Sequence, residues 1–300
     1  MNKMPTLNRE EADLFYKILN ELVYFSNLRF KIIDNFSKPN EGNWDIYDIG
    51  RIIDKIFSKP EIITSFFSEN PAMLKKEEIE LVKLWKTFVK DKFLAFKNKD
   101  KTIFFSSEKE PKAYEVNGIY DDFFDMVPFE PIMVEAVLIQ FKDKIVYPGL
   151  FKPFSISFGG GFRKGLKIDF EKSKLKFGII SSLDKPIEEK KQSEEELFRF
   201  YLKNKNNRDE YWNEINKILG KNPSLKNVYH NEIGKSYMRE IKKIFSDIEI
   251  KSGWFAVVNS QIIASGKNEK EVVERLKDIL PEDKIRSAHI FEYKNKEEGE

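Results

Sequence analysis

A glycine-rich turn followed by basic residues is the first segment whose residue types could bind a ligand. Three glycines stand between a predicted strand and a predicted helix. Glycines can expose backbone N–H groups, and the N-terminus of a helix favours an anion. The segment from residue 151 to residue 176 contains seven basic residues and only two acidic ones. The segment therefore predicts contact with a phosphate or a nucleic acid through Gly159, Gly160, Gly161, Arg163, Lys164 and Lys167.

The same turn has a purely structural interpretation. The glycines would then serve a tight connection that needs positive φ, and the basic residues would form a solvated helix face. The segment lacks the Gly-Lys-Ser/Thr of a phosphate-binding loop and the spacing of a dinucleotide fingerprint. A second Gly-Lys pair, Gly266-Lys267, is followed by Asn268 where such a loop has Ser or Thr. We interpret Gly266 as a turn residue and Asn268 as a helix N-cap with Glu271 as its partner.

An acidic cluster offers a different chemistry. Asp121, Asp122 and Asp125, with Glu130 and Glu135 nearby, could hold Mg²⁺ or divide acid and base work between two carboxylates. In the alternative interpretation, Asp121 and Asp122 cap a short helix whose aromatic residues are buried. The caps are the interpretation that we favour.

Other catalytic sets are sparse. The chain has no cysteine, which excludes disulfides, thiolate catalysis and sulfur-bound zinc. His230 and His289 are its two histidines, and neither accompanies a recognisable triad motif. We therefore predict no catalytic residues, no metal site and no cofactor.

The elements that would position these residues predict an α+β protein. Residues 10–90 carry apolar side chains at helical spacing. Residues 92–158 are short β-rich runs separated by charged or Pro/Gly turns, which predicts an antiparallel β-meander with a hairpin turn at 142–144. The polar segment 184–196 is the best linker candidate, and its Ser193 and Glu196 form a capping box for the next helix.

Domain boundaries follow from these patterns. We predict a helical and antiparallel-β body at 1–185 and a helical connector at 186–249. A small ββαβ module should follow at 250–293, and a charged tail at 294–300.

Composition limits the class of protein. Of 300 residues, 41% are hydrophobic and 27 are Phe, which is enough apolar surface for a folded core. Basic and acidic residues nearly balance at a net charge of +2, so attraction to nucleic acid must come from a local patch. No segment approaches the ~20 apolar residues of a membrane span, and the first residues lack the apolar run of a signal peptide. We expect a cytoplasmic protein without membrane partners.

Two stretches resemble known families. Over roughly residues 12–185, ENPAMLKKEEIELVKLWKTFV, VEAVLIQFKDKIVYPGLF and ISFGGGFRKGL resemble an uncharacterised prokaryotic family. That family shares an Asn-Pro segment with an LxxEELxLVxxW helix, a VLLPFKGKIIYDGL-like hairpin and an FGGGIRREL-like turn. This chain has Pro148 where the family tends to have Asp.

The second resemblance covers roughly residues 250–293. WFAVVNSQIIASGKNEKEVVERLK is similar to a small family of unknown function whose members read YVAVVNGEVVASGKTLEEL. The resemblance implies a compact β-hairpin–helix–β fold and no chemistry.

Three functions follow as expectations. The first is a non-enzymatic binding or regulatory protein, with protein and nucleic acid open as partners. The second is a protein that contacts nucleic acid or another polyphosphate through residues 158–176. The third is a metal-dependent hydrolase that uses Asp121, Asp122 and Asp125.

Overall fold

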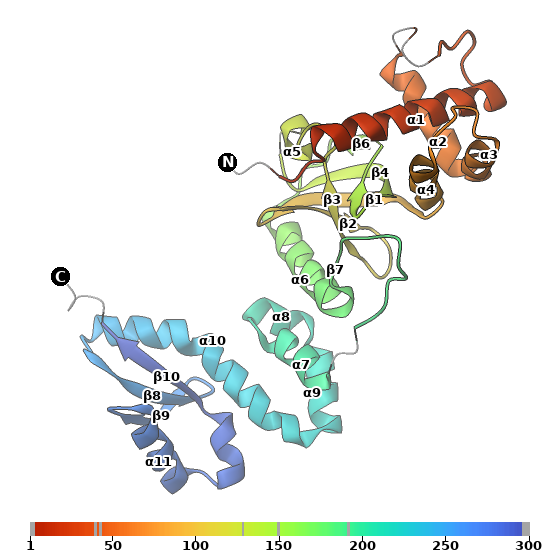
Figure 1. The fold of residues 1–300 in the computed structure, drawn as a ribbon. Helices are drawn as coiled ribbons and strands as arrows, with labels where there is room; N and C mark the ends of the chain where they lie inside the picture. Colours follow the sequence, from red (N-terminus) through yellow and green to blue (C-terminus); the bar gives the residue numbers. More distant parts are fainter. Residues whose placement is uncertain are drawn as a thin grey trace. The chain divides into compact units, whose positions relative to one another are not determined.

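The computed structural model describes residues 4–38, 41, 44–127, 129–148, 151–190 and 193–295. The chain divides into two compact units, Met1–Lys190 and Lys191–Glu300, and each is described by itself (Figure 1). Helices accompany a mixed sheet in the first unit and an antiparallel sheet in the second, so the α+β class is confirmed.

The N-terminal unit begins with a helical layer. Its helices are α1 (Arg9–Phe30), α2 (Ile46–Ser58), α3 (Glu61–Glu69) and α4 (Lys76–Leu84). Asn8 and Glu11 form a capping box at the start of α1, and Asp45 caps α2 by accepting from the backbone N–H of Tyr47 and Asp48. These caps fix where each helix starts, because they satisfy N–H groups that have no partner within the helix.

A small closed barrel follows the helices. Its strands are β1 (Phe88–Asn98), β2 (Lys101–Ser106), β3 (Ala113–Asn117), β4 (Ile132–Phe141) and β5 (Lys144–Val146), and the short helix α5 (Phe123–Met126) lies between β3 and β4. The order is β1-β2-β3-β5-β4, and β1 also pairs with β4, which closes the ring. The predicted antiparallel β-meander is correct for β1 to β3. It is wrong for β5, which pairs with β3 in parallel.

Alternation along the strands separates two faces. Phe93, Phe104, Tyr114 and Leu138 point into the barrel, where they are almost fully buried. The intervening residues of β4, among them Ile139 and Phe141, point outward and form one core with the helices α1 to α4. The helical layer therefore covers the C-terminal part of the outer face of β4.

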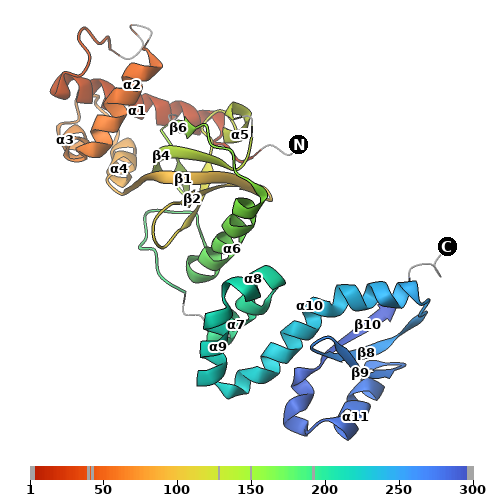
Figure 2. The same cartoon turned by 180° about the vertical axis from the view of Figure 1, so that it is seen from behind.

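Another part of the barrel's outer face is covered by α6 (Gly160–Phe177). Phe170 of α6 packs edge-on against Phe96 and Phe105, whose ring centroids lie 5.2 and 6.1 Å away. Figure 2 shows α6 beside the strands, on a side of the barrel different from that of α1. Two more short strands complete the unit: β6 (Phe151–Phe154) pairs with β4, and β7 (Ile179–Ile180) pairs with β3.

The C-terminal unit builds a three-stranded antiparallel sheet in the order β10-β8-β9. Its strands are β8 (Ser252–Val258), β9 (Gln261–Gly266) and β10 (His289–Lys294), and its helices are α7 (Glu194–Leu202), α8 (Lys205–Glu210), α9 (Trp212–Lys221), α10 (Lys226–Asp247) and α11 (Glu269–Ile279). Two short 3-10 helices, η1 (Pro223–Leu225) and η2 (Glu282–Ser287), connect them. Ile241 and Phe245 of α10 share a core with Phe291 of β10.

The predicted boundaries can be compared with these units. Part of the segment predicted as a connector, 186–249, forms α7 to α10 inside the C-terminal unit. The linker candidate is exposed and irregular over 184–190, and its residues 191–192 lie outside the described part of the chain. Of the predicted tail, 296–300 also lie outside it. Among the described residues, no helix has the length and apolar character to cross a bilayer.

Candidate functional site

The glycine turn lies at the start of α6. Gly159 is the N-cap in an extended conformation (φ −72°, ψ 169°), and Gly160 and Gly161 form the first helical turn. The interpretation that these glycines need positive φ is wrong, because among the described glycines Gly178 alone has it. A Cβ added at any of the three would meet no atom within 4 Å. The fold therefore gives no steric or conformational reason for the glycines.

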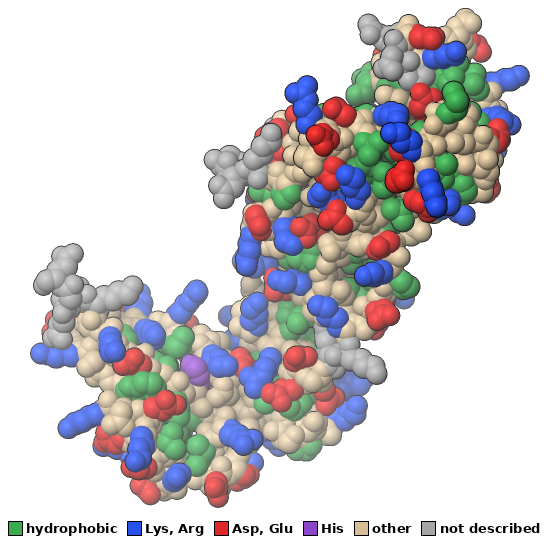
Figure 3. Space-filling model, in the orientation of Figure 1, with side chains coloured by type: hydrophobic (Ala, Val, Ile, Leu, Met, Phe, Trp, Pro, Cys, Tyr) green, Lys and Arg blue, Asp and Glu red, His purple; other side chains and the backbone are tan. Residues whose placement is uncertain are grey.

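The predicted basic residues lie on the first turns of this helix. Arg163, Lys164 and Lys167 are exposed, and none of their side chains has a hydrogen bond or ion pair with another described residue. Figure 3 shows basic and acidic side chains interspersed over the visible face of the molecule. The turn is thus an open cluster of three cations beside uncapped backbone N–H groups.

The acidic cluster is not brought together. Asp122 is buried, and its two carboxylate oxygens accept from the backbone N–H of Met4 at 2.7 Å and of Phe124 at 2.9 Å, so it caps α5. Glu130 accepts from the backbone N–H of Lys97, while Glu135 lies on β4. Within the described ranges, no group of three acidic or histidine side chains is arranged to hold a metal ion.

The remaining sequence candidates have structural roles. Asn268 caps α11 as predicted, but the predicted capping box does not form, because the Glu271 carboxylate accepts from the backbone N–H of Lys267 at 2.8 Å instead of that of Asn268. His230 contacts the Asn259 side chain at 2.8 Å. His289 is half-buried on β10, and its burial lowers its pKa.

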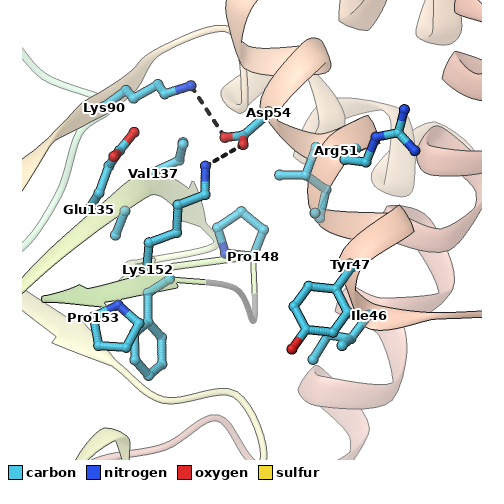
Figure 4. Close-up of a pocket in the computed structure, with 14 residues that line it drawn as sticks. Ile46, Tyr47, Arg51, Asp54, Lys90, Glu135, Val137, Pro148, Lys152 and Pro153 are labelled. Atoms are coloured by element: carbon cyan, nitrogen blue, oxygen red, sulfur yellow. Dashed lines mark hydrogen bonds and ion pairs between the residues drawn. The ribbon is translucent and has the colours of Figure 1, made fainter. Parts of the chain in front are cut away.

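A cavity that the sequence did not reveal lies in the N-terminal unit, between α2 and the outer face of β4 and β6 (Figure 4). Its volume is about 590 Å³. The lining side chains are mainly apolar, with five charged residues among them: Ile46, Tyr47, Gly50, Arg51, Ile53, Asp54, Lys90, Glu135, Ala136, Val137, Pro148, Phe151, Lys152 and Pro153. We call this cavity the α2 pocket.

One wall of the α2 pocket comes from α2 itself. Ile52 and Ile56 face the core and are fully buried, whereas Ile46 and Tyr47 leave 59% and 80% of their surface exposed. Gly50 stands one turn after Ile46 and one turn before Asp54, so it lies in the middle of the wall. The first turns of α2 thus present apolar side chains that the described residues leave exposed.

Charged side chains form the opposite part of the pocket. Asp54 reaches from α2 towards the sheet, where its carboxylate contacts Lys152 of β6 at 2.7 Å and Lys90 of β1 at 3.4 Å (Figure 4). Burial alone would raise the pKa of Asp54, but the two lysines outweigh it and the pKa lies below its usual value. The hydrogen bond that Lys152 donates to Asp54 likewise raises the pKa of Lys152. Asp54 and Lys152 are therefore charged at neutral pH.

The strand register places a second carboxylate between lysines. Glu135 of β4 lies directly across from Lys92 of β1 and from Lys152 of β6. Residues opposite each other in an antiparallel pair have Cβ atoms about 5 Å apart, so their charges interact. Lys152, Glu135 and Lys92 thus form a row of alternating charges across three strands, of which Lys152 and Glu135 line the α2 pocket.

The sequence carried only a weak signal for this site. Tyr47 lies outside the buried stripe of its helix, which indicates an apolar surface with another use, whereas Ile46 lies two turns before the buried Ile53 on nearly the same face. Nothing local, however, connects Asp54 of α2 with Lys90 and Lys152, which follow it by 36 and 98 residues in the chain.

Comparisons with protein-family models, with curated proteins and with solved structures found no match. The two family resemblances seen in the sequence therefore stay predictions.

Proposed function

We propose that this chain is a non-enzymatic binding protein whose N-terminal unit holds a small, mainly apolar molecule in the α2 pocket. The observation that carries the proposal is the cavity of about 590 Å³ with a largely apolar lining and one group of charged side chains. Small-molecule sites typically measure about 300–1,000 Å³ and combine such a lining with a few polar groups that fix orientation. The exposure of Ile46 and Tyr47 supports the proposal, because a ligand would cover them.

A screen of metabolite-sized molecules by thermal shift tests the proposal. A ligand at 100 times its Kd stabilises the folded state by about 2.7 kcal/mol, which is a readily measured shift. Gly50→Leu places a side chain in the middle of the α2 wall, so it should abolish the shift while the variant stays folded. The matched control is Gly165→Leu, at an open helical position of α6. Equal responses of Gly50→Leu and the wild type would contradict the proposal.

A second candidate function is contact with nucleic acid or another polyphosphate through the start of α6. It is supported by three exposed, unpartnered cations beside glycines that the fold does not require. Binding should weaken steeply with salt, because phosphate contacts release counterions. Titration of labelled single- and double-stranded nucleic acids at two salt concentrations measures this salt dependence of the affinity. The double variant Lys164→Glu, Lys167→Glu should abolish binding. An affinity that changes neither with salt nor in this variant would exclude this function.

A further inference from the structure

The lysines of the α2 pocket have hydrogen-bond donors left over. An ammonium group carries three N–H donors. Within the described residues, Lys90 and Lys152 each donate one hydrogen bond, and both bonds go to the same carboxylate, that of Asp54. Additional acceptors can therefore bind both ammonium groups without displacing Asp54.

The charges around the pocket floor do not cancel. Three lysines, Lys90, Lys92 and Lys152, face two carboxylates, Asp54 and Glu135. Arg51 lines the same pocket, but its guanidinium lies 3.6 Å from Asp48, which offsets it. Lys92 does not line the pocket, but it lies directly across from Glu135, so around the charged end of the cavity one positive charge remains in excess.

The apolar end lies apart from these charges. Figure 4 shows Ile46 and Tyr47 on the side of the cavity away from Lys90, with Pro148 between them and the Asp54 carboxylate. A ligand that satisfies both ends must carry a hydrophobic body and one anionic group at its edge.

Building on the proposed binding function, we infer that the α2 pocket takes an apolar monoanion. The hydrophobic body of the ligand lies between Tyr47 and Pro153, and its carboxylate, sulfonate or phosphate diester lies against Lys90 and Lys152. A lysine ammonium that loses water needs a charged partner, and its hydrogen bond to an anion is stronger than one to a neutral acceptor. The lysine pair should therefore favour an anionic ligand over a neutral ligand of the same shape.

A matched pair of fluorescent probes tests this inference on the full-length chain. Anilinonaphthalene sulfonate and N-phenylnaphthylamine share one aromatic body, and only the first is an anion. Each is titrated into the wild type and into variants whose folding is checked by circular dichroism. The ratio of the two dissociation constants cancels the intrinsic affinity of the shared body.

Two substitutions should move this ratio in opposite directions. Lys152→Met keeps the length of the side chain and removes its charge, so it should weaken the sulfonate probe about tenfold, the size expected for a charge-assisted hydrogen bond. Asp54→Asn leaves both lysines without their carboxylate, so it should strengthen the sulfonate probe severalfold. Neither should change the affinity of the neutral probe by more than about twofold. Lys99→Met, at the exposed β1–β2 turn outside the pocket, is the control and should change neither.

The outcomes separate this inference from the function on which it rests. If neither probe binds the wild type, or if both bind Gly50→Leu equally well, the proposed function fails. If the neutral probe binds and Gly50→Leu blocks it, but the sulfonate probe does not bind or ignores Lys152→Met and Asp54→Asn, the pocket stands and the monoanion inference is overturned.

Discussion

Two carboxylates of the N-terminal unit, those of Asp54 and Glu11, each contact two lysines. The exposure of each carboxylate determines how much its ion pairs add to stability. Asp54 of the α2 pocket keeps 42% of its side chain exposed, so solvent screens its ion pairs and they add little to stability. Glu11 keeps only 11%, and it contacts Lys142 at 3.1 Å and Lys144 at 3.0 Å. Glu11 therefore ties the start of α1 to the β4–β5 turn.

Glu11→Gln should destabilise the N-terminal unit by about 1–3 kcal/mol at neutral pH, because two ammonium groups lose their charged acceptor. Burial alone would raise the pKa of Glu11, but the two lysines and the Asn8 backbone N–H outweigh it and lower the pKa. A lowered pKa stabilises the folded state above the unfolded-state value of about 4.3, and the effect disappears as pH falls through the folded-state pKa.

Hydrogen exchange of N-terminal peptides in urea, at neutral and at acidic pH, measures the effect of Glu11→Gln. The difference between wild type and variant should shrink in acid. The neighbouring Glu10→Gln is the control, since Glu10 is exposed and has no described partner. A loss of stability that is the same at both pH values would show that the charge of Glu11 is not the cause.

Close packing of α10 on its sheet depends on one glycine. A Cβ at Gly234 would lie 3.0 Å from the Val257 carbonyl oxygen and 3.2 Å from the Cβ of His289. The carbonyl belongs to the central strand β8, which pairs on both sides and cannot move aside easily. Gly234 thus sets the distance between helix and sheet.

We expect Gly234→Val to destabilise the C-terminal unit by about 2 kcal/mol or more, through overpacking. Gly220→Val is the matched control, because Gly220 is also helical but has open space around it, and it should be nearly neutral. Thermal unfolding of the two variants compares them. If the Gly234→Val protein were as stable as the Gly220→Val control, α10 would not be packed closely against the sheet at Gly234.

Element ends were the part of the fold that local sequence predicted best. The Ser193–Glu196 capping box, the Asn268 cap and the Asp122 cap all form, because each needs only side chains within three residues of one another. The hairpin turn at 142–144 was predicted from the same kind of local signal. The closure of the barrel was not, since β1 meets β4 across some 40 residues and no local pattern selects that partner.

The candidate site divides in the same way. The glycine turn was visible as a continuous motif and does lie at a helix start. The α2 pocket could not be predicted, because Asp54, Lys90, Glu135 and Lys152 come from four elements that meet only in the folded unit.

At the scale of the whole molecule, the chain consists of two units joined through an exposed segment. Residues 184–190 are irregular and exposed, and Lys190 donates one backbone hydrogen bond to Lys176. A glutamyl endopeptidase should therefore cut first at Glu188 or Glu189, apart from trimming at the chain ends. Mass spectrometry of a time course would show two fragments that match the units. Early cuts within α1 or α11 would contradict this division.

The central claim is that the α2 pocket binds a ligand, and hydrogen exchange with and without a saturating small-molecule probe tests it most directly. We predict slower exchange in peptides that cover residues 46–54 and 151–154, and unchanged exchange in peptides from the C-terminal unit. Gly50→Leu should remove the protection. Slower exchange confined to residues 160–167, or no protection anywhere at saturation, would contradict the account.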